Sequence, residues 1–261
     1  MCFTDLHHQA SPLLLANVWD AASARAAESA GYAAIGTSSA AIAAMLGYAD
    51  GEEVSFSELH ALVLRLRAVT ELPLTVDMEA GYGDTAAAVV ENLLKLAASG
   101  VIGVNLEDSV VIRNGGNDVR NLLDSAVFAR RLRDIRAGLQ AAGVSLFLNA
   151  RTDTFLLNVD DARAQTIARG RMYAANGADG LFIPCLVNEA DIAAIVAGIP
   201  LPVNVMCMPH LPGFSRLAEL GVKRISMGNF LYQRGQRILQ ELYVAVRGEQ
   251  SFQALVDDAG H

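Results

Sequence analysis

The chain is poor in the residues that several common kinds of site require. Its three cysteines, Cys2, Cys185 and Cys207, are odd in number and lack metal-ligand spacing, so neither a disulfide framework nor a zinc site is expected. Only two lysines are present, Lys95 and Lys223, and neither position favours Schiff-base catalysis. These shortages leave carboxylates and arginines as the main candidates for chemistry.

Positive charge and long apolar runs are also scarce. A net charge of −8 and a pI near 5.1 argue against a nucleic-acid partner or an anionic membrane surface. No apolar run is long enough for a transmembrane helix, and residues 1–12 lack the basic and apolar regions of a secretory signal. The sequence therefore predicts a cytoplasmic protein.

Strand-like apolar segments alternate with helical patterns along the 261 residues. Several helical patterns end at a glycine before the next strand, which is typical of βαβ units. Such a series predicts a single-domain (β/α)8 TIM barrel over residues 1–261, with a doubly wound sheet as the alternative. The predicted strands are residues 13–17, 33–37, 74–77, 104–107, 146–150, 180–184, 203–206 and 224–227, and the predicted helices are residues 21–30, 85–98, 125–141, 161–175 and 189–197.

Polar side chains follow most of the predicted strands. A barrel gathers such residues around its C-terminal end, whereas a doubly wound sheet concentrates them at one switch point, so the pattern favours the barrel. Residues 40–56 and 109–121 interrupt the alternation and are expected to be loops over the barrel mouth, the first ordered and the second a flexible lid. The polar residues are Trp19, Asp20, Ser38, Ser39, Asp77, Glu79, Glu107, Asp108, Arg151 and Asp153.

Residues 76–84 set two carboxylates beside a glycine-rich turn. Asp77 and Glu79 are spaced i, i+2, which places them on the same face of a strand, where like charges require a cation or protons. Together with Asp50 and Glu107 they predict a Mg²⁺ site, with Mn²⁺ as the alternative ion, because Mg²⁺ is usually held by one or two carboxylates and the substrate. The competing interpretation makes these residues helix caps and turn formers.

Arg151 is a candidate for binding a substrate carboxylate or phosphonate, since its planar guanidinium matches both groups. A structural ion pair with Asp153 is the alternative. Ser38 and Ser39 can offer hydroxyl and backbone N–H donors to a substrate, although small-residue packing at a strand end explains them nearly as well.

Five segments, in this order and spacing, resemble the isocitrate lyase/phosphoenolpyruvate mutase superfamily over roughly residues 15–227. They are residues 17–24, 47–50, 76–83, 103–108 and 149–153. The resemblance implies a (β/α)8 barrel, Mg²⁺, and small 2-oxo acid substrates that react through an enolate-like species. It also implies a homotetramer or homodimer with exchanged C-terminal helices, which residues 231–261 are expected to supply.

The same motifs imply roles for individual residues. In the metal site, Asp77 resembles the direct ligand, and three carboxylates resemble those that hold metal-bound water: Asp50, Glu79 and Glu107. Substrate contacts are expected at Trp19, Ser38, Ser39, Ala40, Asp77, Arg151 and Asn204. Catalytic roles are expected for Arg151, Arg113 and Glu107.

The loop after the fourth predicted strand departs from the lyases. Lyase members carry Lys-Lys/Arg-Cys-Gly-His there, with the cysteine as general acid, whereas residues 113–117 read Arg-Asn-Gly-Gly-Asn. Cys185 also stands near the place of a lyase glutamate. The leading hypothesis is therefore Mg²⁺-dependent C–C cleavage of a small 2-oxo acid, as a lyase or decarboxylase, because decarboxylation needs no loop cysteine. The alternatives are P–C bond chemistry on phosphonopyruvate, and binding of a 2-oxo acid without turnover.

Overall fold

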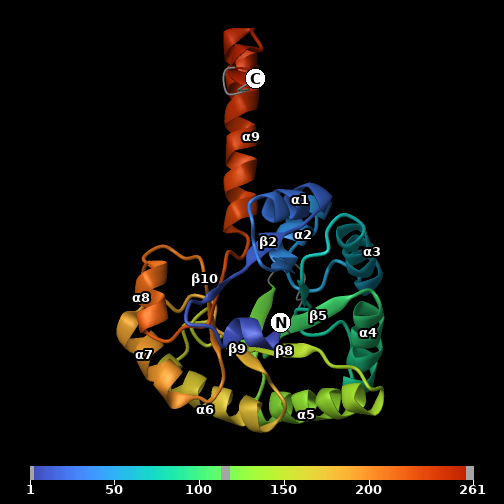
Figure 1. Ribbon diagram of the computed structural model, residues 1–261, viewed down its shortest axis with the longest axis vertical. Coiled ribbons are helices and arrows are strands. Elements are labelled where there is room, and N and C mark those ends of the chain that lie inside the picture. Colours follow the sequence, from blue (N-terminus) through green and yellow to red (C-terminus); the bar gives the residue numbers. More distant parts are fainter. Residues whose placement is uncertain (1–2, 113–117, 257–261) are drawn as a thin grey trace.

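A computed structural model describes residues 3–112 and 118–256 (Figure 1). Its centre is a parallel sheet in the spatial order β1-β11-β10-β9-β8-β5-β4-β3-β2. A separate antiparallel pair, β6 and β7, follows β5. The strands are β1 (Leu13–Leu14), β2 (Ala16–Val18), β3 (Ile35–Thr37), β4 (Leu74–Asp77), β5 (Val101–Glu107), β6 (Ser109–Ile112), β7 (Val119–Leu122), β8 (Phe147–Arg151), β9 (Gly180–Phe182), β10 (Val203–Met206) and β11 (Arg224–Ser226).

The two edges of the sheet meet at β1 and β2, which are two parts of one interrupted strand. β1 and β2 are separated by Leu15 alone, whose N–H donates to the carbonyl oxygen of Ile225 at 2.8 Å. β1 pairs with β11 and β2 pairs with β3, so the two parts of this strand join opposite edges of the sheet. The result is the eight-position (β/α)8 barrel that the sequence predicts, and this prediction is confirmed.

Helices surround the barrel and connect its strands (Figure 1). Many begin at a residue whose side chain accepts a hydrogen bond from the first turn, and Asp20 and Ser55 form complete capping boxes. Their apolar faces pack on the strands to form one large core. The helices are α1 (Ala21–Ser29), α2 (Ser39–Leu46), α3 (Phe56–Arg67), α4 (Ala86–Ala98), α5 (Ser125–Ala141), α6 (Ala162–Ala175), α7 (Glu189–Gly198), α8 (Phe214–Glu219), α9 (Phe230–Glu249) and α10 (Gln253–Val256).

The N-terminal segment covers one end of the barrel. The short 3-10 helix η1 (Thr4–His7) brings the His7 ring onto Phe147, the first residue of β8, with a centroid distance of 4.3 Å. The Phe3 ring packs edge-on against the Phe147 ring, with a centroid distance of 5.5 Å. This end lies at the start of the strands, so the opposite, C-terminal end is the one left for a site.

Two segments expected to be loops contain regular structure. In residues 40–56, α2 starts directly after β3, because Ser38 caps it and a run of alanines favours helix; the loop is shorter than expected. In residues 109–121, β6 and β7 pair as antiparallel strands with Val111 opposite Arg120. Arg113 and the rest of residues 113–117 lie outside the described residues.

The long helix α9 projects away from the barrel and is followed by α10 (Figure 1). No side chain of α9 is buried in the single chain. The described part of the predicted extension is thus helical, while exchange of these helices between subunits stays a prediction. Across residues 3–112 and 118–256, no helix combines the length and hydrophobicity that a membrane span needs.

Candidate active site

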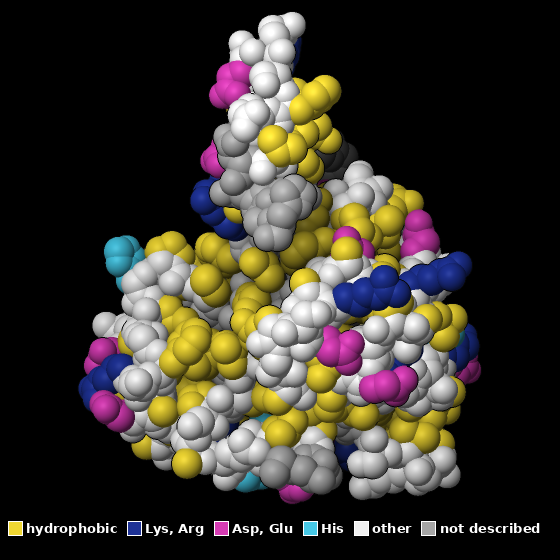
Figure 2. Space-filling view, turned by 45° about the horizontal axis from the view of Figure 1, so that its top comes forward, with side chains coloured by type: hydrophobic (Ala, Val, Ile, Leu, Met, Phe, Trp, Pro, Cys, Tyr) yellow, Lys and Arg dark blue, Asp and Glu magenta, His cyan; other side chains and the backbone are white. Residues whose placement is uncertain are grey.

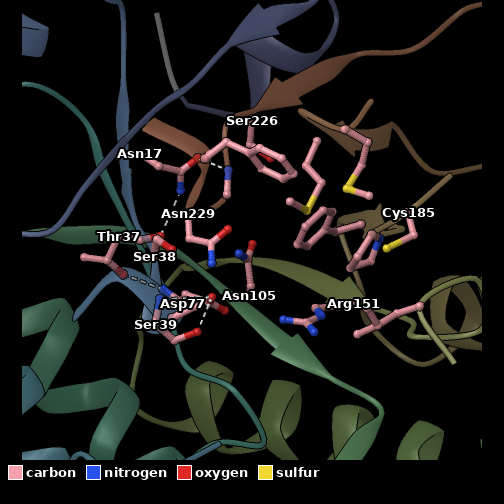
Figure 3. Close-up of a pocket in the computed structure, with 18 of the residues that line it drawn as sticks. Asn17, Thr37, Ser38, Ser39, Asp77, Asn105, Arg151, Cys185, Ser226 and Asn229 are labelled. Atoms are coloured by element: carbon pink, nitrogen blue, oxygen red, sulfur yellow. Dashed lines mark hydrogen bonds between the residues drawn. The ribbon is translucent and has the colours of Figure 1, made fainter. Parts of the chain in front are cut away.

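A cavity of about 310 Å³ lies at the C-terminal end of the barrel (Figure 3). In Figure 3, Asn17, Ser38, Ser39 and Asp77 gather on one side of it, and Cys185 lies on the other. The predicted site residues that line the cavity are Ser38, Ser39, Ala40, Asp50, Asp77 and Arg151. The predicted site residues that do not line it are Trp19, Glu79, Glu107 and Asn204.

Asp77 ends β4 and presents one free carboxylate oxygen. Its N–H donates to the Thr37 hydroxyl at 2.8 Å, and its Oδ2 accepts from the Ser39 hydroxyl at 2.9 Å. Its Oδ1 is buried and has no hydrogen-bond partner. A buried carboxylate oxygen without a donor is costly unless a cation compensates it. Asp77 Oδ1 therefore fits the role of a direct metal ligand.

Glu79, by contrast, uses both of its carboxylate oxygens. Oε1 accepts from the Tyr82 hydroxyl at 2.9 Å, and Oε2 accepts from the Glu52 N–H at 2.6 Å. The Glu52 side chain in turn accepts from the Tyr82 N–H at 2.7 Å. Burial, followed by the charges of Asp50 and Asp77, raises the pKa of Glu79 to about 8. These contacts make Glu79 the residue that fastens the α2–α3 loop to the turn after β4.

Glu107, at the end of β5, lies between two arginines. Its Oε1 forms an ion pair with Arg120 and accepts from the Ser109 hydroxyl at 3.2 Å. Its Oε2 lies 2.9 Å from Arg151 Nη1, an ion pair without hydrogen-bond alignment. Burial raises the pKa of Glu107, against the lowering effect of Arg151.

Arg120 is a site residue that the sequence pattern did not reveal. It comes from β7 and contacts Asp50 Oδ2 at 3.3 Å through Nη2, in addition to its ion pair with Glu107. Its segment was expected to be a flexible lid, so no fixed position was expected for its side chains. The sequence carries no signal that would have found it, because the apolar Val119 is exposed in β7 while Arg120 lies on the less exposed face with Leu122.

Arg151 lies at the cavity and also pairs with Asp153, while its contact with substrate stays a prediction. It lines the cavity, and it is also held by Asp153 through Nε at 2.6 Å and Nη2 at 3.1 Å. Burial acts to lower the pKa of Arg151. The carboxylates of Glu107 and Asp153 outweigh burial and raise this pKa well above its ordinary value. The guanidinium is therefore a fixed, permanently charged group at the cavity edge.

Carboxyl groups outnumber guanidinium groups in and beside the cavity. Five carboxyl groups, those of Asp50, Asp77, Glu79, Glu107 and Asp153, accompany three guanidinium groups, those of Arg120, Arg151 and Arg224. Four of these groups line the cavity, Asp50, Asp77, Arg151 and Arg224, and the raised pKa of Glu79 opposes its ionisation without a cation. Within the described residues, no three His, Cys, Asp or Glu side chains form a complete metal site. An ion would thus depend on Asp77, water and substrate, as Mg²⁺ commonly does.

Asparagines cross the barrel beneath the cavity. Asn149 Nδ2 donates to Asn105 Oδ1 at 2.9 Å and to Asn204 Oδ1 at 3.1 Å, and Asn204 donates to the Ser226 hydroxyl at 3.2 Å. Asn105 and Ser226 line the cavity. Asn204 therefore supports the site from below.

Trp19 lies outside the cavity, in a separate apolar groove beside α1. Its ring meets Tyr232 of α9 with a centroid distance of 5.2 Å. The substrate contact expected for Trp19 thus has no counterpart in the cavity.

Comparison with known proteins gives the family. Residues 3–247 match the family model described as phosphoenolpyruvate phosphomutase. The chain belongs to this family. The superfamily resemblance of the sequence motifs is thereby confirmed, and so is the prediction that the chain is an enzyme of that superfamily.

Individual relatives cover most of the chain. An uncharacterised protein of Mycobacterium tuberculosis is 34% identical over 90% of this chain and 84% of its own length. The oxaloacetate decarboxylase of Bradyrhizobium sp. is 30% identical over 89% of this chain and 79% of its own. A solved structure from Burkholderia cenocepacia J2315, described as a candidate phosphonomutase, has a TM-score of 0.85 at 42% identity and covers 92% of this chain and 97% of its own.

Proposed function

We propose that this enzyme uses Mg²⁺, with Mn²⁺ as a substitute, to cleave a C–C bond of a small 2-oxo acid, as a lyase or decarboxylase. The buried, unpartnered Oδ1 of Asp77 at the cavity edge carries the proposal. The similarity to an oxaloacetate decarboxylase supports the reaction class. When bound at Asp77, the ion would polarise the 2-oxo group and stabilise the negative charge that develops on its oxygen.

The carboxylates around Asp77 have different roles. Asp50 lines the cavity and is half exposed, so it is best placed to hold a water ligand of the ion. Glu107 and Glu79 have both oxygens engaged, and they orient Arg151 and the α2–α3 loop, respectively. The proposed metal site therefore has one direct protein ligand, Asp77, and neighbouring carboxylates that hold the residues around it in place.

The substrate carboxylate would bind at the start of α2. Ser38 caps this helix by accepting from the Ala41 N–H at 3.3 Å. The backbone N–H of Ala40 lies at the helix N-terminus, which favours an anion through the helix dipole, while the N–H of Ser39 donates to Asp77 Oδ2 at 3.4 Å. Arg151 adds a full positive charge across the cavity. Together these groups would orient the 2-oxo acid against the metal position.

P–C bond chemistry on phosphonopyruvate is the second candidate. The family model is described as a phosphomutase, and the Burkholderia structure as a candidate phosphonomutase. Release of phosphate or formation of phosphoenolpyruvate from phosphonopyruvate would favour this reaction over C–C cleavage.

The test compares wild type with Asp77→Asn and with Asp84→Asn, an exposed matched control. Chelated enzyme is supplied with Mg²⁺ and screened on oxaloacetate, related 2-oxo acids and phosphonopyruvate, with enzyme-free Mg²⁺ blanks. We expect Mg²⁺-dependent pyruvate release from oxaloacetate by wild type and Asp84→Asn, and a rate about 100-fold lower in Asp77→Asn, which corresponds to about 2.7 kcal/mol of charge stabilisation. Mn²⁺ binding followed by EPR should weaken in the same variant. Full activity of Asp77→Asn, or no turnover of any 2-oxo acid, would overturn the proposal.

A further inference from the structure

The cavity has one wall formed mainly by apolar side chains. Opposite Asp77, the lining comes from the ends of β9 and β10, the segment after β8 and the start of α9. Figure 3 shows Cys185 on this side, across the cavity from Ser38 and Ser39. The apolar side chains of this wall are Leu156, Phe182, Pro184, Met206, Met208 and Phe230.

One cation borders this wall: the guanidinium carbon of Arg151 lies 5.9 Å from the centre of the Phe182 ring. The guanidinium groups that reach the cavity belong to Arg151 and Arg224. Arg151 is held by Glu107 and Asp153 and binds the head group in the proposed function, and the Nε and Nη1 of Arg224 are fully buried without a hydrogen-bond partner. A second carboxylate or a phosphonate placed against this wall would lose its hydration and would compete with the head group for Arg151, which is unfavourable.

Apolar side chains that border a cavity are instead suited to alkyl groups. Leu156 is 40% exposed, and Met206 and Met208 are partly exposed. Methionine side chains adapt to irregular apolar ligands, and contact with an alkyl group would remove this surface from water.

We propose that the apolar wall, formed by these six side chains, binds an uncharged alkyl substituent on C3 of the substrate, while the polar side holds its 2-oxo acid head. The preferred substrates are then 3-alkyl 2-oxo acids, in preference to those that extend a second charged group from C3 toward this wall. This inference rests on the proposed function for the placement of the head group.

A binding series tests the wall without requiring turnover. Pyruvate, 2-oxobutanoate and 2-oxopentanoate are titrated calorimetrically into the Mg²⁺-loaded enzyme, with 2-oxoglutarate as the charged counterpart. We expect affinity to rise about fourfold per added methylene, the value of burying one such group. We expect 2-oxoglutarate to bind more weakly than 2-oxopentanoate. Equal affinity along the series, or tightest binding of 2-oxoglutarate, would overturn the inference.

A charge variant provides the second arm. Met208→Lys should reverse the preference, strengthening 2-oxoglutarate and weakening 2-oxopentanoate, because it places an ammonium at the wall. Cys207→Lys is the matched control, since this neighbouring side chain is exposed and does not line the cavity. Unchanged preference in a folded Met208→Lys protein counts against the wall, and the wild-type series decides the matter if that variant does not fold.

Turnover separates this inference from the proposed function. Oxaloacetate and its 3-methyl and 3-ethyl derivatives share both carboxylates and differ in the alkyl group alone, so kcat/KM should rise along that series. If oxaloacetate is cleaved but neither series shows the trend, the wall is wrong and the function stands. If the binding series shows the trend but no acid is cleaved, the function is wrong and the wall stands.

Discussion

Arg120 of β7 forms an ion pair with Glu107 of β5, and the same guanidinium lies 3.3 Å from Asp50 in the α2–α3 loop. One side chain thus connects the β6–β7 hairpin, a barrel strand and a loop that borders the cavity. Its side chain is 16% exposed, so the ion pair with Glu107 is largely shielded from water. Shielded pairs of this kind are costly to break from one side.

The first prediction concerns this arrangement. In metal-free protein, Arg120→Gln should lower the free energy of unfolding by about 3 kcal/mol, because Asp50 and Glu107 lose a shared cation. Added Mg²⁺ should reduce the loss, since the ion supplies positive charge nearby. Urea unfolding with chelator and with Mg²⁺ measures both effects. Arg133→Gln, which breaks an exposed pair, is the control, and equal stability of the two variants would contradict the prediction.

The second prediction concerns a buried network behind the site. Asp108 is fully buried, and its Oδ2 accepts from Tyr173 at 2.7 Å, Thr152 at 2.8 Å and Arg169 at 2.9 Å. Its Oδ1 accepts from the N–H of Asp153 at 3.1 Å, which places the carboxylate that holds Arg151. Asp108 therefore links Arg169 and Tyr173 of α6 to Asp153 at the cavity edge.

Asp108→Asn keeps the shape of the side chain but leaves Arg169 without its counter-ion. The new amide also brings two N–H donors against groups that already donate to this position. We expect a loss of about 3 kcal/mol in unfolding free energy. Asp191→Asn, which breaks an exposed pair with Arg163, should cost less than about 0.5 kcal/mol. Chemical denaturation of both variants checks this, and similar small losses would show that the network contributes little.

The barrel was largely predictable because its signals are local. The bounds of β4, β10 and α5 coincide with the predicted residues, since each apolar or periodic run is delimited by a cap, a glycine or a proline. The helix α2 was missed because its apolar residues lack an amphipathic period, being buried on several sides. The β6–β7 hairpin was missed because its glycines and asparagines indicated a flexible loop.

The site was predictable to the extent that position along a strand decides it. Asp77 and Arg151 follow strands whose ends meet at one mouth, so their proximity could be inferred. The partners of each oxygen could not be inferred, because they depend on side-chain packing between distant segments. Arg224, for example, contacts Thr75 across the barrel, and Glu79 binds a loop N–H instead of facing the cavity.

The third prediction is a pH dependence of stability centred on His7. Its ring is 1% exposed, with Nδ1 3.1 Å from the Phe3 carbonyl oxygen and Nε2 without a partner. Burial, assisted by the positive charges of Arg224 and His8, lowers the pKa of His7 to about 4. The unfolded chain therefore binds more protons than the folded one between pH 6.5 and 4, so stability falls as the pH falls through this range.

The expected contribution of His7 is a loss of about 1.6 kcal/mol between pH 6.5 and pH 5. His7→Phe preserves a ring against Phe147 and cannot titrate, so its unfolding free energy should change less over the same range. Urea unfolding at several pH values measures the difference between the two proteins. Parallel pH profiles would contradict the assignment of this dependence to His7.

The fourth prediction concerns the apolar surface of α9. Large side chains on this helix are exposed in the single chain, among them Ile238 at 43% and Tyr243 at 69%. Figure 2 shows hydrophobic side chains on the projecting helix and around its base. A groove of about 510 Å³ between α1 and α9, lined by Trp19 and Ile238, continues this surface. Monomers rarely leave such contiguous apolar surface in water, so a second copy of the chain is the expected cover.

Sedimentation velocity should therefore show a homotetramer or homodimer. Ile238→Glu and Tyr243→Glu should dissociate it, because each places a charge in an apolar contact that the assembly would bury. Gln240→Glu adds the same charge elsewhere on α9 and should leave the assembly intact. The barrel core contains no side chain of α9, so the dissociated variants should keep the far-UV CD of a folded barrel. A monomeric wild type, or an assembly unaffected by both substitutions, would exclude α9 as the interface.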